Sequence, residues 1–242
     1  IKAVHATGKP YAVVLINGRP LTINWLAENS PAILEAWFPG TMAGPAIIDT
    51  LFGDSNPGGK LPVTFPRSVG QIPLFYNQKR TGRPFQGTET MLQDIPAEAG
   101  QTSLGNTSFY LDAGNDPLYP FGYGLSYSTF KYDNLKLSSE KLKEGDVLTV
   151  SFDLTNTGKY DATEVAQLYV QDRFGSVTRP VKELNRFERI ALKSGESRSV
   201  SFSLPIQELA FWNIDMKKVV AVSYTHLRAH ETGLDLVCRP LL

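Results

Sequence analysis

The hydrophobic pattern of the first part of the chain predicts alternating strands and helices. Residues 11–17 (YAVVLIN) and 32–38 (AILEAWF) are continuous apolar runs, which are typical of strands buried on both faces of a sheet. Residues 21–27 and 42–52 have the length and spacing of short helices. Residues 60–65 (KLPVTF) supply a third strand, which its proline confines to a sheet edge. This order predicts an α/β unit whose parallel sheet is covered by helices.

The pattern changes to a period of two after residue 121. Apolar and polar residues alternate through residues 148–155, 166–170 and 198–204, with turn signals between these runs. Short strands without helices between them predict an antiparallel β-sandwich of the immunoglobulin-like type. Residues 66–120 are rich in Gly, Pro, Asn, Thr and Gln and show little periodicity, so we expect long loops there.

These patterns divide the chain into an α/β part (residues 1–125), a β-sandwich (residues 126–220) and a tail (residues 221–242). We expect the tail to be foreign to the fold, because the alternation stops where a sandwich needs its last strand. Two of the three histidines and the sole cysteine fall in it, and it looks like the translated adapter sequence that sometimes ends reading frames assembled from environmental DNA. Its removal should then leave the melting temperature unchanged. A helical metal site of His226 and His230 is the alternative.

Charge and composition exclude several classes of function. The chain has 24 Lys and Arg against 24 Asp and Glu, so no net field favours nucleic acid or an anionic membrane surface. Its apolar runs are shorter than the roughly 18 residues that span a bilayer. Cys238 is the only cysteine and His5 the only histidine before the tail, which excludes a disulfide, a zinc cluster and a Ser-His-Asp triad from the body. We therefore expect no metal and no cofactor, and any catalysis must use carboxylates.

The start of the sequence and one glycine-rich run add two further expectations. Ile1 is followed by neither the basic nor the apolar region of a signal peptide, so we expect an internal piece of a longer protein. Residues 53–60 (GDSNPGGK) invite comparison with a phosphate-binding loop. Leu61 stands where that motif needs Ser or Thr, and a turn is the preferred interpretation.

The loop region holds polar and aromatic residues that could contact a sugar. Its carboxylates could serve a two-carboxylate hydrolase, although each taken singly is a solvated loop charge. They include Asp94, Glu98, Asp112 and Asp116. Its aromatic side chains could stack on a sugar or pack in a core. Asn106 begins a glycosylation sequon of the kind that often arises by chance.

Six motifs occur in the order and spacing of a known family. They are residues 14–20 (VLINGRP), 35–40 (EAWFPG), 51–62 (LFGDSNPGGKLP), 64–66 (TFP), 81–84 (TGRP) and 117–127 (PLYPFGYGLSY). Together they closely resemble glycoside hydrolase family 3, over about nine tenths of the chain. From residue 126 onward the sequence resembles the fibronectin type III-like domain of that family.

The resemblance implies a retaining exo-hydrolase with a (β/α)8 barrel, an α/β sandwich domain and a final β domain. In such enzymes an Asp nucleophile comes from the barrel and a Glu acid/base from the sandwich domain. Neither matches a motif of this chain, so we assign no catalytic residue. Arg83, Tyr110 and Asp112 are the candidate substrate-binding residues, since a guanidinium or a carboxylate can bond sugar hydroxyls. Loop architecture is the alternative interpretation for all three.

Two hypotheses follow for function. In the first, a longer parent enzyme, periplasmic or secreted, hydrolyses terminal non-reducing β-D-glucosyl residues of a glucoside or oligosaccharide. This chain then supplies scaffold and site wall beside a missing barrel, is inactive alone, and binds neither nucleic acid nor membrane. In the second, the chain is a stand-alone carbohydrate-binding or structural module built around the sandwich. Its predicted strand aromatics fit a core better than an exposed platform, which favours the first hypothesis.

Overall fold

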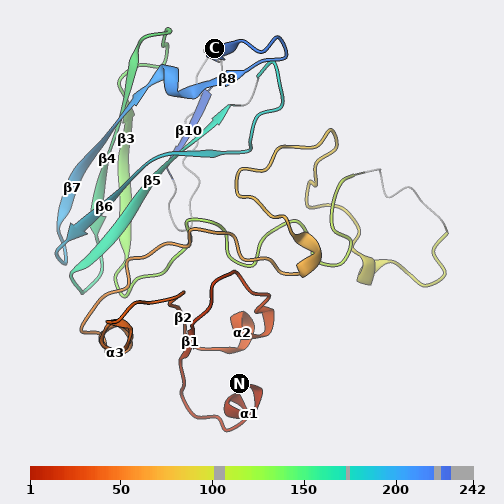
Figure 1. Cartoon of the computed structure of the whole chain (residues 1–242), viewed down its shortest axis with the longest axis vertical. Coiled ribbons are helices and arrows are strands. Elements are labelled where there is room, and N and C mark those ends of the chain that lie inside the picture. Colours follow the sequence, from red (N-terminus) through yellow and green to blue (C-terminus); the bar gives the residue numbers. More distant parts are fainter. Residues whose placement is uncertain (101–106, 173–174, 221–224, 230–242) are drawn as a thin grey trace. The chain divides into compact units, whose positions relative to one another are not determined.

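The computed structural model describes residues 1–100, 107–172, 175–220 and 225–229 (Figure 1). The chain forms two compact units, and each unit is made of three separate segments of the sequence. Unit 1 consists of Ile1–Ser55, Leu61–Phe75 and Thr81–Phe121, and unit 2 of Asn56–Lys60, Tyr76–Arg80 and the chain from Gly122 onward. The α/β class followed by an all-β class is confirmed.

Unit 1 holds the short elements of the predicted α/β part. They are α1 (Lys2–His5), β1 (Val13–Leu15), α2 (Asn24–Asn29), β2 (Ile33–Glu35), α3 (Ala43–Phe52), and the 3₁₀ turns η1 (Val69–Gln71) and η2 (Leu92–Asp94). β1 pairs with β2 in parallel, with Val13 opposite Ile33, as expected. α3 ends at Gly53, whose φ of 89° gives the left-handed C-cap that favours glycine.

Two expectations for unit 1 are wrong. Residues 60–65 form no strand: Pro62 has no N–H to donate, and Phe65 makes a single bridge to Tyr119. The strands are also not buried on both faces, since β2 is half-buried throughout. Helix α3 likewise has no buried residue. In the part of the chain that the structure describes, β1 and β2 pair only with each other, so the sheet is too narrow to bury them.

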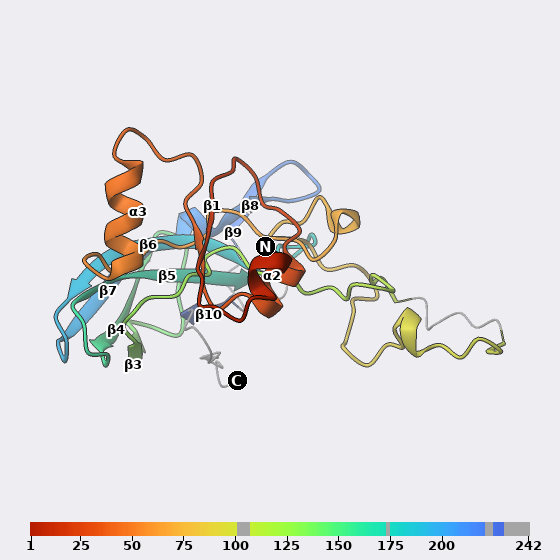
Figure 2. The same ribbon diagram turned by 90° about the horizontal axis from the view of Figure 1, so that it is seen from below.

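Unit 2 is an antiparallel β-sandwich, as the alternation predicts. Its elements are β3 (Phe130–Leu137), β4 (Val147–Asn156), β5 (Ala162–Asp172), β6 (Glu183–Leu192), β7 (Ser197–Pro205), η4 (Ile206–Leu209), β8 (Ala210–Trp212), β9 (Lys218–Val220) and β10 (Thr225–Ala229). One sheet has the order β3-β4-β7 and the other β10-β5-β6, and β8 pairs with β9. Figures 1 and 2 show the two larger sheets as two layers.

The core of the sandwich lies between these two sheets. Alternate residues of β4 are buried, and Val150 and Leu154 are fully inaccessible to solvent. Phe152 packs against the rings of Tyr132 and Phe202, at centroid distances of 5.5 and 5.9 Å. Burying each such side chain contributes about 1.5–3 kcal/mol, which makes this cluster the main source of stability in unit 2.

The tail contains a strand that the sequence analysis excludes. β10 pairs antiparallel with β5, from Thr225 opposite Asp172 to Ala229 opposite Leu168. The expectation that the sandwich lacks its last strand is therefore wrong for residues 225–229. The edge of β5 offers unpaired N–H and C=O groups, and five residues without clean alternation suffice to pair with them. His230 and the remainder of the tail lie outside the described residues, as does Asn106.

Candidate functional site

The loops predicted to form a sugar-site wall belong to unit 1 and are anchored on one buried amide. Gln71, with no exposed side-chain surface, accepts hydrogen bonds from the N–H groups of Arg67 (2.7 Å) and Ser68 (3.4 Å). Its Nε2 donates to the carbonyl of Gly114 at 3.1 Å. The base of the long loop is thus fixed by a satisfied buried polar group, which costs far less than an unpaired one.

Tyr110 is part of this anchor. Its hydroxyl donates to the carbonyl oxygen of Gln71 at 3.3 Å, and its N–H donates to Oδ1 of Asn115 at 3.2 Å. The side chain is 37 % exposed. These contacts give the hydroxyl an architectural role, while part of the ring stays open to solvent.

Arg83 and Asp112 are both exposed side chains on the same loops. The carbonyl of Arg83 accepts from the N–H of Ser108 at 2.9 Å, so segment 83–85 lies beside segment 108–110. The rings of Phe85 and Phe109 stack there at 5.7 Å. The structure therefore brings Arg83 and Tyr110 onto adjacent segments, and places Asp112 in the turn that follows.

The loop carboxylates proposed for a two-carboxylate hydrolase are all exposed, which fits solvated loop charges. They are Asp94, Glu98, Asp112 and Asp116.

Glu89 is a structural carboxylate that the sequence analysis missed. It accepts hydrogen bonds from the N–H groups of Gln86 and Gly87 (both 2.9 Å) and of Thr88 (3.0 Å). Burial tends to raise the pKa of Glu89, but these backbone bonds together hold it below its ordinary value. The carboxylate thus fixes a turn of the loop, at a glycine with a φ of 87°.

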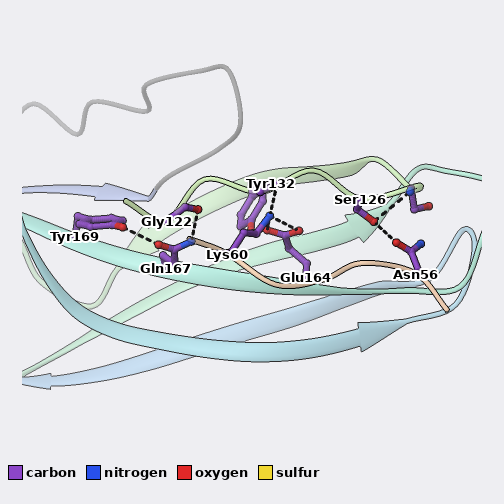
Figure 3. Close-up of polar contacts among 10 residues, drawn as sticks. Asn56, Lys60, Gly122, Ser126, Tyr132, Glu164, Gln167 and Tyr169 are labelled. Atoms are coloured by element: carbon purple, nitrogen blue, oxygen red, sulfur yellow. Dashed lines mark hydrogen bonds and ion pairs between the residues drawn. The ribbon is translucent and has the colours of Figure 1, made fainter. Parts of the chain in front are cut away.

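A second polar cluster lies in unit 2, around the glycine-rich run that invited a phosphate-loop interpretation (Figure 3). Lys60 Nζ is 3.0 and 3.2 Å from the two carboxylate oxygens of Glu164, and it donates to the carbonyl of Gly124 at 2.9 Å. The lysine therefore binds a protein carboxylate, which supports the rejection of a phosphate site. Sequence offered no signal for this pair, because its partners lie 104 residues apart.

Comparison with known proteins identifies the class of protein to which this geometry belongs. Residues 1–127 match the model of the glycosyl hydrolase family 3 C-terminal domain, and residues 164–227 match that of the fibronectin type III-like domain. The first match covers more than half of the 242 residues, and the chain belongs to glycosyl hydrolase family 3. The second match extends into the segment expected to be foreign, in agreement with the pairing of β10.

Among its relatives is the periplasmic beta-glucosidase of Salmonella typhimurium, 49 % identical over 217 residues, which are 90 % of this chain and 27 % of that protein. A beta-xylosidase of Formosa agariphila is 48 % identical over 220 residues, 91 % of this chain and 28 % of that protein. The crystal structure of Listeria innocua beta-glucosidase with isofagomine superposes with a TM-score of 0.85 at 41 % identity, covering 97 % of this chain and 31 % of that one. The chain thus spans less than a third of these relatives. No helix among the described residues is long and apolar enough to cross a membrane.

Proposed function

We propose that this chain is the C-terminal part of a retaining, exo-acting β-glucosidase that removes terminal non-reducing β-D-glucosyl residues. Its nucleophile and acid/base belong to other parts of the parent, including a (β/α)8 barrel, and the parent works in the periplasm or outside the cell. The domain limits proposed are 1–125 for the α/β part and 126–229 for the β-sandwich with β10, which leaves residues 230–242 as the tail. The chain itself supplies scaffold and loops.

One observation carries this proposal: two domains follow each other here as in a beta-glucosidase that is 49 % identical over 90 % of the chain. The name of that relative supports the periplasmic location. A stand-alone sandwich module has less support, because the similarity runs through both units. β-Xylosidase activity is the second candidate, favoured by the 48 % identity to the Formosa enzyme.

We further propose that Arg83 and Asp112 bond sugar hydroxyls in the parent and that the ring of Tyr110 lines the same wall. Their exposure on one set of anchored loops supports this role. An Asp112→Asn variant of the parent should raise KM severalfold, because a carboxylate accepts charge-assisted bonds that an amide does not replace. Asp116→Asn, on the same loop and also exposed, is the matched control. Equal KM values for both variants would exclude Asp112 from the site.

The proposal is tested with aryl β-glucosides and aryl β-xylosides. The chain alone should turn over neither, because a double displacement needs two carboxyl groups about 5–5.5 Å apart. The parent, meaning this chain joined to its upstream sequence, should cleave the glucoside faster. Faster cleavage of the xyloside would replace the assignment by β-xylosidase, and a parent inert to both would overturn it. Turnover by the chain that disappears on mutation of one of its own carboxylates would refute the missing-nucleophile argument.

A further inference from the structure

A five-residue segment that precedes the sandwich in the sequence packs as part of the sandwich unit. Asn56–Lys60, here called the strap, groups with unit 2 although the residues before and after it belong to unit 1. We propose that the strap is an obligatory element of the β-sandwich, docked on β5, and that its Lys60 supplies the counter-charge for a buried carboxylate inside the sandwich. The proposal does not depend on the activity of the parent.

The ion pair of Lys60 and Glu164 lies in a site with little solvent. The side chains are 10 % and 8 % exposed, and the hydroxyl of Tyr132 donates to Glu164 Oε1 at 3.3 Å (Figure 3). Glu164 belongs to β5 and Tyr132 to β3, so the lysine reaches a point where the two sheets meet. A carboxylate at this depth is costly without a cation, and the strap provides one.

Asn56 fixes the other end of the strap. Its Oδ1 accepts from the hydroxyl of Ser126 at 2.7 Å and from the N–H of Tyr127 at 3.1 Å. Its Nδ2 donates to the carbonyl of Asp161, just before β5, at 3.5 Å. The strap is therefore held at both ends by groups of the sandwich unit, as Figure 3 shows for Ser126.

Glycine allows the middle of the strap to approach β5 closely. A Cβ on Gly58 would lie 2.6 Å from the carbonyl oxygen of Thr163, a distance that real Cβ atoms do not adopt. A Cβ on Gly124 would collide with the carbonyl oxygen of Gly59. A Cβ on Gly59, by contrast, would meet nothing within 4 Å. The glycines at 58 and 124 thus serve backbone contact, while the one at 59 does not.

These contacts imply that a sandwich made of residues 126–220 alone would lose both the ammonium that faces Glu164 and the backbone that lies against Thr163 of β5. The β domain is then not an autonomous module, in contrast to the second hypothesis from sequence. The Asn-Pro-Gly-Gly-Lys run acts as a docking segment for β5, a role that neither the phosphate-loop nor the simple-turn interpretation includes.

The two adjacent glycines provide the first test, made in the full chain. Gly58→Ala should lower the melting temperature of the sandwich by more than about 5 °C, since about 1 kcal/mol corresponds to 4–8 °C in a domain of this size. It should also speed amide exchange in β5. Gly59→Ala should change the melting temperature by no more than about 1 °C. Neither glycine has a positive φ, so backbone strain does not distinguish them. Equal effects of the two variants would overturn the docking contact.

A double-mutant cycle tests the ion pair. Lys60→Met should raise the unfolding equilibrium constant of the sandwich about a hundredfold or more, because it leaves a buried charge unpaired. Combining it with Glu164→Gln should recover part of that loss. Lys131→Met is the control: its ion pair with Asp133 is exposed, and we expect about a fivefold change at most.

Two results would overturn the proposal: a Lys60→Met effect no larger than that of Lys131→Met, or strictly additive effects of Lys60→Met and Glu164→Gln. If Lys60→Met fails to fold, the double variant decides. A folded double variant supports the buried-charge argument, and an unfolded one rejects it.

Discussion

Glu196 illustrates how a single carboxylate determines a local structure at the residue scale. It closes the turn between β6 and β7: its Oε2 accepts from the N–H of Lys193 at 2.8 Å, and its Oε1 lies 3.1 Å from Arg198 Nη2. The backbone bond from Lys193, then the bond from Arg198, lower the pKa of Glu196 below its ordinary value. Gly195 in the same turn has a φ of 76°.

This lowered pKa predicts a pH-dependent effect of Glu196→Gln. Because the folded-state pKa lies below the unfolded one, the stabilisation is present above the ordinary carboxyl pKa of about 4.3 and is lost as pH falls through the folded value. At pH 7 the free energy of unfolding of the variant should be lower than that of the unsubstituted chain. The difference between the two should shrink below about pH 4. Urea unfolding at a series of pH values measures it, with Glu140→Gln as an exposed control. A difference that does not vary with pH would contradict the prediction.

Sequence could suggest only part of the polar contacts at this scale. Arg83, Tyr110 and Asp112 are loop residues whose side chains can bond sugar hydroxyls, and the structure adds that the Tyr110 hydroxyl donates to the backbone carbonyl of Gln71. The burial of Gln71 and Lys60 could not be predicted. Polar side chains are rarely buried, and their partners lie 43 and 104 residues away along the chain. Such contacts depend on tertiary structure, which local patterning does not specify.

At the scale of elements, periodicity predicted the sandwich well and the α/β unit less well. β4 and β7 alternate cleanly because one face of each is buried by the other sheet. In residues 60–65 the apolar content suggested a strand, but the proline and the docking of Lys60 take that segment out of any ladder. β10 was missed because an edge strand pairs through its backbone and needs little side-chain pattern.

The pairing of β10 predicts the effect of truncation. A chain ending after residue 220 should melt about 5–10 °C below a chain ending after residue 229, because the backbone of β5 from Leu168 to Asp172 loses its partner strand. Amide exchange in that part of β5 should accelerate in the shorter chain. Equal melting temperatures would restore the view that the whole tail is foreign. The native or foreign origin of residues 230–242 stays a prediction.

At the scale of the whole molecule, the two units differ in how much apolar surface they bury. The sandwich encloses a continuous cluster, whereas buried hydrophobic side chains in unit 1 are few among the described residues, and include Val13, Ile23 and Phe65. Phe38 and Phe52 of unit 1 are 77 % and 79 % exposed. The chain also spans less than a third of its relatives. We expect the exposed apolar side chains to be covered in a complete parent.

This difference predicts that unit 1 is the less stable part of the isolated chain. Its two-stranded sheet and uncovered helix α3 should open at a lower free energy than the strands of the sandwich. In hydrogen exchange, amides of β1 and β2 should exchange before those of β4 and β7, and limited trypsin digestion should cut first between residues 66 and 120. The strap adds a specific signature. Lys60 should resist trypsin longer than exposed Arg80, which precedes Thr81, because the Lys60 side chain is only 10 % exposed and paired with Glu164. Equal protection of both units, or early cleavage at Lys60, would contradict this order of stability.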